Sequence, residues 1–157
     1  MTFDRPDVTR RLLCEDLQRT SLGPFMNQRP LAILIIDDEA AVRGTLSLLL
    51  SRSGFKVIGV EAGEEGIAVA RREIPSLIFC DERLAGEDGY SFLRKLKGDA
   101  LTRPIPVIMI GGTCENGLGD WRHEGAASFL AKPFEVRKLW ALVRQLTAPE
   151  QSLTSTV

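Results

Sequence analysis

The chain has 157 residues, 44% of them hydrophobic and 26% charged, and its 20 basic and 21 acidic side chains give a net charge of -1. This composition predicts one globular domain with a core of ordinary size and leaves no global field that would attract nucleic acid or anionic lipid. No apolar run is long enough to cross a bilayer, and the first twenty residues lack the hydrophobic region of a signal peptide. The three cysteines have neither metal-binding spacing nor the pattern of a disulfide framework. We therefore expect a reduced, cytoplasmic protein that does not bind membranes.

The two ends of the chain are expected to lie outside the folded domain. Residues 1–30 form an extension in which 7–20 favours a short amphipathic helix, because its apolar residues recur at helical spacing. These are Val8, Leu12, Leu13 and Leu17. Residues 148–157 are rich in Ser, Thr and Gln, which is typical of a disordered tail. The folded domain is then 31–147, and the extension either packs on it, pairs with a second copy as a homodimer, or stays free.

Between these ends, apolar runs alternate with segments of helical periodicity. The expected strands are Leu31–Ile36, Lys56–Val60, Leu77–Cys80, Pro106–Ile110 and Ala127–Leu130. The expected helices are Ala40–Ser53, Glu64–Arg72, Gly89–Lys97 and Glu135–Leu146. Asp81–Asp88 is expected to be a loop, and the glycines of Gly111–Gly125 allow only a short, weak helix. This alternation predicts an α/β fold with a doubly wound, five-stranded parallel sheet.

Charged side chains stand where three of the expected strands end. Asp37 and Asp38 follow the first strand, Asp81 follows the third and Lys132 the fifth. Because ligands bind outside the carboxyl ends of strands in an open parallel sheet, we expect these residues to meet in one cleft. Carboxylates this close repel one another, which raises the pKa of some of them unless a cation lies between them. Oxygen ligands of this kind suit Mg²⁺ or Mn²⁺, and such a cluster with a lysine suits phosphoryl transfer to a carboxylate.

Each of these residues also has a purely structural interpretation. Asp37 or Asp38 would suit the cap of the following helix. Asp81 could begin a turn, and Lys132 could be an ordinary exposed lysine. The placement of all four at one edge of the predicted sheet favours the functional interpretation.

The same residues resemble the receiver domain of two-component response regulators, the CheY-like family, whose fold is a flavodoxin-like (βα)5 sandwich. The resemblance covers nearly all of Leu31–Leu146. Its motifs are the acidic pair in Ile35-Ile36-Asp37-Asp38-Glu39, Asp81 in DERLAGEDG, Gly125-Ala126 and Lys132-Pro133-Phe134. An acidic pair by itself would be weak evidence for this family, whereas the combination of these motifs in this order is highly specific to it.

The resemblance implies a phosphoacceptor and a metal site. Asp81 would be the phosphoacceptor. Asp38, Asp81 and the backbone carbonyl of Arg83 would bind Mg²⁺ directly, and Asp37 would act mainly through water.

The resemblance also implies phosphoryl contacts and switch positions. Lys132 and the backbone N–H of Gly112 would contact phosphoryl oxygens, and the Lys132–Pro133 peptide would be cis. Phe129 takes the position of the aromatic switch residue on the last strand.

The chain departs from the family pattern at the end of the fourth strand. The family usually has Thr or Ser there, and this chain has Gly111. Without that hydroxyl the usual coupling from the phosphoryl group to the surface is in doubt, and we expect Gly111→Thr to give a larger conformational response. Glu82 and Arg83 lie beside the site, where side chains tune the access of water.

The sequence therefore predicts a receiver module that accepts a phosphoryl group on Asp81 from a histidine kinase or a histidine phosphotransfer protein. It would assist its own phosphorylation and dephosphorylation, and signal by contact with a downstream protein, rather than act as an enzyme on external substrates. Few residues follow the last expected helix, so no direct DNA binding is expected.

Three alternatives use the same fold differently. A degenerate receiver would bind proteins without phosphorylation; the intact acidic pocket argues against it, and Gly111 argues for it. Phosphohydrolases of the haloacid dehalogenase class carry a DxDxT run after the first strand, and flavin-binding proteins carry a phosphate loop rich in Ser and Thr. Asp37-Asp38-Glu39-Ala40 matches neither.

Overall fold

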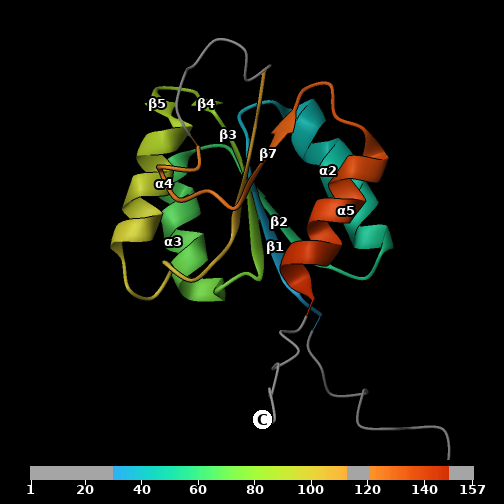
Figure 1. Cartoon of the computed structure of the whole chain (residues 1–157), viewed down its shortest axis with the longest axis horizontal. Helices are drawn as coiled ribbons and strands as arrows, with labels where there is room; N and C mark the ends of the chain where they lie inside the picture. Colours follow the sequence, from blue (N-terminus) through green and yellow to red (C-terminus); the bar gives the residue numbers. More distant parts are fainter. Residues whose placement is uncertain (1–29, 113–120, 149–157) are drawn as a thin grey trace, which may run out of the picture.

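A computed structural model describes residues 30–112 and 121–148 of the chain. Five strands form one parallel sheet in the order β2-β1-β3-β6-β7. They are β1 (Ala32–Ile36), β2 (Lys56–Val60), β3 (Leu77–Asp81), β6 (Val107–Gly111) and β7 (Ser128–Ala131). Figure 1 shows α2 and α5 on one face of the sheet and α3 and α4 on the other. These are α2 (Ala40–Arg52), α3 (Gly63–Glu73), α4 (Gly89–Gly98) and α5 (Val136–Thr147).

The doubly wound α/β fold predicted from the sequence is confirmed. Every predicted strand and helix within the described ranges begins and ends within one residue of its observed bounds. The predicted helix over 7–20 and the tail over 148–157 lie outside the described residues, apart from residue 148. Most of the weak helix expected within Gly111–Gly125 lies outside them too, and residues 121–125 form turns. No described helix combines the length and apolar character that crossing a bilayer requires.

One local expectation was wrong, because part of the Asp81–Asp88 loop forms a small antiparallel pair. Its strands are β4 (Arg83–Leu84) and β5 (Glu87–Asp88). Gly86 has a φ of 80°, a conformation that glycine adopts without strain, and this lets a two-residue turn join the strands. The sequence lacks a long apolar alternation here, so the pairing was not predicted.

The sheet is apolar because helices cover both of its faces. Every residue of β3 and β6 is buried. Ile36, Ile78 and Met109 belong to the core cluster beneath α3 and α4, whereas Ile35 and Phe79 belong to the cluster beneath α2 and α5. A strand buried on both faces reads as a continuous apolar run, which is why the strands could be located from sequence. At the ends of β1, β3 and β7, the charged residues Asp37, Asp81 and Lys132 mark the edge of the sheet.

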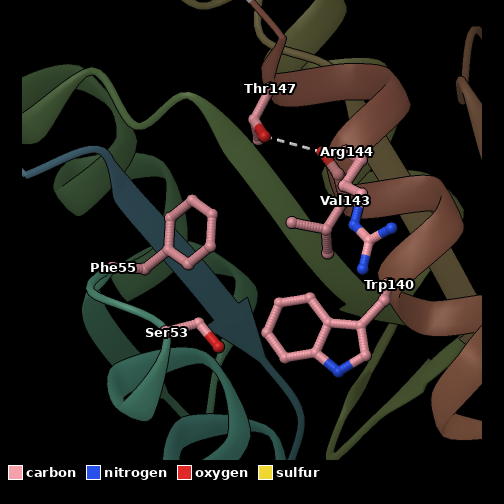
Figure 2. A pocket seen from close by; sticks show the side chains of 6 residues that line it. All are labelled: Ser53, Phe55, Trp140, Val143, Arg144 and Thr147. Carbon is pink, nitrogen blue, oxygen red and sulfur yellow. Dashed lines mark hydrogen bonds between the residues drawn. The ribbon is translucent and has the colours of Figure 1, made fainter.

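A shallow cavity lies at the opposite edge of the sheet, near the start of β2 and the end of α5 (Figure 2). Its lining combines aromatic, aliphatic and polar side chains: Ser53, Phe55, Trp140, Val143, Arg144 and Thr147. Thr147 Oγ1 donates to the carbonyl of Val143 at 2.7 Å and so closes the last turn of α5. The cavity is remote from the strand ends that carry the charged residues.

The start of α4 packs directly against the end of β3. The Asp88 side chain caps this helix by accepting a hydrogen bond from the N–H of Tyr90 at 2.9 Å. The N–H of Gly89 donates to the carbonyl of Glu82 at 3.0 Å. A Cβ added to Gly89 would overlap the carbonyl oxygen of Asp81. Glycine is therefore required where the helix meets the backbone of the strand end.

We predict that Gly89→Ala destabilises the protein by about 1–3 kcal/mol, the usual cost of forcing extra volume into a packed site. Gly44 is the matched control, because it lies inside α2 with open space around its Cα. Gly44→Ala should instead stabilise the protein by about 0.5–1 kcal/mol, since alanine favours the helix more than glycine does. Urea denaturation measures both changes. A Gly89→Ala protein as stable as the wild type would contradict this packing.

Candidate functional site

Three neighbouring strand ends bring the charged residues together. Asp37 follows β1 and Asp81 ends β3, and these two strands pair in register at Ile36 and Cys80. Lys132 follows β7, which is separated from β3 by β6. The lysine side chain therefore has to cross the end of β6 to reach the carboxylates. The sequence-based expectation that these residues meet at one edge of the sheet agrees with the structure.

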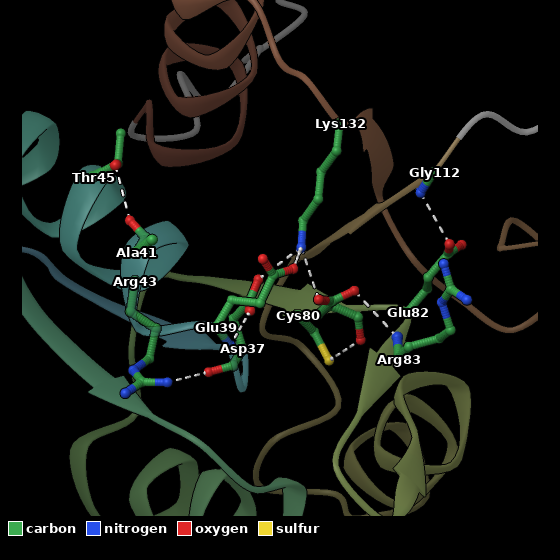
Figure 3. A network of polar contacts seen from close by, with 11 residues as sticks. Asp37, Glu39, Ala41, Arg43, Thr45, Cys80, Glu82, Arg83, Gly112 and Lys132 are labelled. Atoms are coloured by element: carbon green, nitrogen blue, oxygen red, sulfur yellow. Dashed lines mark hydrogen bonds and ion pairs between the residues drawn. The ribbon is translucent and has the colours of Figure 1, made fainter.

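The ammonium group of Lys132 lies among three carboxylates. Its Nζ atom is 2.8 Å from Asp81 Oδ2, 3.2 Å from Asp37 Oδ2 and 3.0 Å from Glu39 Oε1. Figure 3 shows the side chain reaching down toward Asp37 and Glu39. Asp37 is fully buried and Asp81 is 5% exposed, so the ion pairs with these two aspartates are partly shielded from water, whereas Glu39 is exposed. Shielded contacts of this kind are stronger than ion pairs on the surface.

The carboxylates also form a group that would suit a divalent cation. One oxygen from each of Asp37, Asp38 and Asp81 lies within 4.8 Å of the other two. Asp38 is exposed and gives the group access to solvent. Carboxylate oxygens with retained waters are the ligands that Mg²⁺ prefers. The donor set therefore fits the magnesium site expected from the sequence.

Burial sets the protonation behaviour of the cluster. It raises the pKa of Asp37, and the charge of Asp81 raises it further, while hydrogen bonds from the Glu39 N–H and from Lys132 act in the opposite direction. Burial lowers the pKa of Lys132, but its hydrogen bonds to Asp81, Glu39 and Asp37 outweigh that effect, so its pKa lies above the ordinary value. Lys132 therefore stays charged, whereas ionising Asp37 costs more free energy in this site than in water.

The turn that was the structural interpretation of Asp81 is present, and Asp37 forms a similar turn; both turns are compatible with a role in the site. Asp37 Oδ1 accepts the backbone N–H of Glu39 at 2.8 Å, and Asp81 Oδ1 accepts the N–H of Arg83 at 3.1 Å. Neither Asp37 nor Asp38 caps the following helix, because Glu39 is the N-cap residue of α2 and no side chain makes a cap hydrogen bond there. In both aspartates Oδ1 fixes a local turn, which leaves Oδ2 facing Lys132.

The expected switch positions lie beside this cluster. The Lys132–Pro133 peptide is cis, as expected. Phe129 is 8% exposed and packs in the core cluster beneath α3 and α4. The N–H of Gly112, which was expected to contact a phosphoryl oxygen, donates here to Glu82 Oε1 at 2.9 Å. A Cβ at Gly111 would overlap the Glu82 side chain, so a threonine there would have to displace it.

Sequence reasoning missed two contributors to the site. Glu39 was considered as a neighbour of the acidic pair in the motif, yet it also contacts Lys132. Arg43 was not considered, although its guanidinium donates to the carbonyl of Asp37 at 2.7 Å and pairs with Glu61 at the same distance. The charge of Glu39 next to the acidic pair was the available signal. The Arg43 contact depends on helix geometry that no local motif marks.

Comparison with known proteins finds response regulators and their receiver domains. The model for the response regulator receiver domain matches residues 33–144. Response regulator PleD of Caulobacter vibrioides is 40% identical over 119 residues, which cover 73% of this chain and 26% of PleD. The chain spans about half the length of several other curated relatives that it matches.

Two solved structures share the fold over most of this chain. The crystal structure of a candidate response regulator from Chloroflexus aurantiacus has a TM-score of 0.72 and 30% identity, and covers 77% of this chain and 100% of its own. The receiver domain of sensor histidine kinase PA1611 from Pseudomonas aeruginosa has a TM-score of 0.67, 26% identity and the same coverage. That receiver domain was solved with a magnesium ion coordinated in its active-site cleft.

We predict that Asp37→Asn raises the melting temperature at pH 7 in the presence of a chelator. The pKa of Asp37 is raised by folding, so its ionised form is less favourable in the folded protein than in the unfolded chain. Asp37 has a lower pKa in the unfolded chain than in the folded protein. As the pH rises from the first of these pKa values through the second, the wild type should lose stability relative to the variant. Asparagine keeps an oxygen for the Glu39 N–H and removes the charge.

Differential scanning fluorimetry between pH 4 and pH 8 measures this effect. Asp38→Asn is the matched control, because Asp38 is exposed and its charge is solvated; it should change the melting temperature less. An Asp37→Asn protein that melts below the wild type at pH 7 would show that the ion pair with Lys132 outweighs the cost of burying the charge.

Proposed function

The chain belongs to the response regulator receiver domain family of two-component signalling, and from that premise we propose that it accepts a phosphoryl group on Asp81. The donor would be a phosphohistidine of a histidine kinase or of a histidine phosphotransfer protein. One observation carries the proposal: the nearly buried carboxylate of Asp81 lies 2.8 Å from the Lys132 ammonium, within a group of carboxylates that fits a divalent cation.

Magnesium, or manganese in its place, would be held by oxygen ligands at this edge of the sheet. Asp38, Asp81 and the backbone carbonyl of Arg83 would bind it directly, and Asp37 would act through water. A bound cation would neutralise charge on the transferring phosphoryl group. The magnesium ion in the cleft of the PA1611 receiver domain supports this assignment.

The residues of this chain position the nucleophile and balance its charge. The Asp81 carboxylate oxygen attacks phosphorus, an O–P bond forms, and the N–P bond to the imidazole breaks with its electron pair passing to the ring nitrogen. Asp81 Oδ1 is held by the N–H of Arg83, and Lys132 is close enough to transfer its hydrogen bonds to the phosphoryl oxygens. Attack of water on phosphorus later releases inorganic phosphate and restores the carboxylate.

The proposed output is a contact with a downstream protein in the cytoplasm, rather than DNA binding or catalysis on an external substrate. A second candidate is a receiver that binds its partner without phosphorylation. It is favoured by one observation, the hydrogen bond that occupies the N–H of Gly112. The two candidates differ in whether Asp81 accepts a phosphoryl group.

We predict that the purified protein gains one phosphoryl group when it is incubated with acetyl phosphate and Mg²⁺, as measured by intact mass spectrometry. The gain should disappear in Asp81→Asn and in the presence of a chelator. Asp99→Asn is the matched control, because Asp99 follows α4 at the opposite edge of the sheet and should leave the gain unchanged.

Two results would contradict the proposal. The first is a folded wild-type protein that gains no phosphoryl group, which would favour the phosphorylation-independent module. The second is an equal gain in Asp81→Asn, which would place the modification elsewhere.

A further inference from the structure

The carboxylate of Glu82 occupies the space that a side chain at position 111 would otherwise fill. A Cβ added to Gly111 would lie 2.5 Å from Glu82 Oε2 and 2.6 Å from Glu82 Cγ, closer than real Cβ atoms approach a neighbour. Glu82 Oε1 also accepts the hydrogen bond from the N–H of Gly112. Figure 3 shows the Glu82 side chain pointing toward Gly112. The Glu82 side chain thus fills the space beside Gly111 and also accepts the hydrogen bond of the Gly112 N–H at the end of β6.

The backbone of Glu82 is anchored at both its N–H and its carbonyl, whereas its side chain contacts the end of β6 through its carboxylate. The N–H of Glu82 donates to the carbonyl of Ile110 at 2.8 Å, and its carbonyl accepts the N–H of Gly89 at 3.0 Å. The side chain is half-buried. Because the backbone is anchored to β6 and α4, the carboxylate can leave the end of β6 by side-chain rotation alone.

A phosphoryl group on Asp81 would compete with this arrangement. Asp81 pairs with Ile110 in the sheet, so Gly111 and Gly112 continue β6 directly beside the nucleophile. Phosphoryl oxygens are strong acceptors for backbone N–H groups, and their negative charge opposes a neighbouring carboxylate. The N–H of Gly112 cannot serve the Glu82 carboxylate and a phosphoryl oxygen at full strength together.

We propose that Glu82 is a displaceable plug, and this inference rests on the proposed phosphorylation of Asp81. In the unmodified protein the carboxylate of Glu82 fills the space above Gly111 and holds the N–H of Gly112. Phosphorylation expels the carboxylate into solvent and transfers that N–H to a phosphoryl oxygen. The structural response of this strand end to phosphorylation is then the movement of the Glu82 side chain into solvent. It takes the place of the response of a hydroxyl, which position 111 lacks.

Three variants separate the plug from a simple charge effect. Glu82→Ala removes the side chain, and Glu82→Gln removes its charge but keeps its volume. Gly111→Ala keeps the charge and expels the side chain, because the added Cβ overlaps it. The probe is beryllofluoride with Mg²⁺, a mimic of the phosphoryl group, titrated by ¹⁹F NMR. Gly98→Ala, in open space at the end of α4, is the control that should bind as the wild type does, and Asp81→Asn should not bind.

We expect Glu82→Ala and Gly111→Ala to bind beryllofluoride about tenfold more tightly than the wild type. In both variants the hydrogen bond from the Gly112 N–H to the Glu82 carboxylate no longer competes with binding of the probe, and one charge-assisted hydrogen bond has an effect of this size. Glu82→Gln should gain less. The amide resonance of Gly112 in ¹H–¹⁵N spectra should shift on adding beryllofluoride to the wild type, and in Gly111→Ala it should already be displaced without the probe.

Two results would overturn the plug. In the first, the wild type binds and Gly111→Ala binds no more tightly, with its Gly112 amide resonance unmoved. In the second, Glu82→Gln binds beryllofluoride as tightly as Glu82→Ala does, which would assign the gain in affinity to the loss of charge and not to the loss of the side chain. If neither the wild type nor any variant binds, the proposed phosphorylation fails, and the plug fails with it.

Discussion

The Lys132 ammonium is the contact on which the site depends, because it lies among carboxylates that would otherwise repel one another. It spans from the end of β7 across β6 to Asp81 and Asp37, so it also ties the far strand to the middle of the sheet. Removing such a charge would leave a fully buried Asp37 without its cationic partner, an arrangement that is strongly unfavourable in protein interiors. In the proposed reaction the same ammonium would contact the incoming phosphoryl group, which would link the stability of the resting site to its chemistry.

The fold supplies the geometry that this contact needs. Strands buried on both faces end together at one edge, and their register aligns the residues that follow β1 with the end of β3. Gly89 brings α4 against the carbonyl of Asp81, and Asp81 Oδ1 is fixed by a local turn. The carboxylate of Asp81, the proposed nucleophile, therefore sits at a strand end that is fixed by α4 and by a local turn, while its Oδ2 atom is directed toward Lys132.

The strands could be predicted because each is a continuous apolar run with a clear end, at a charged residue in most cases and at Gly111-Gly112 after the fourth run. The meeting of Asp37, Asp81 and Lys132 followed from one rule about the carboxyl ends of parallel strands. Contacts that depend on how far a side chain reaches were not predictable in this way. Glu39 contacts a lysine 93 positions away, and Glu82 contacts a backbone N–H 30 positions away. No local pattern marks either contact, and both required the three-dimensional arrangement.

The measurement that tests the account most directly is a crystal structure of the protein with Mg²⁺ and beryllofluoride. The account predicts beryllium bonded to a carboxylate oxygen of Asp81, the cation against Asp38 and Asp81, and Lys132 Nζ on a fluorine atom instead of on Asp37. Lys132 still bound to Asp37 and Glu39, with neither beryllium nor a cation at Asp81 in a saturated crystal, would contradict the assignment of this cluster as a phosphoryl-accepting site.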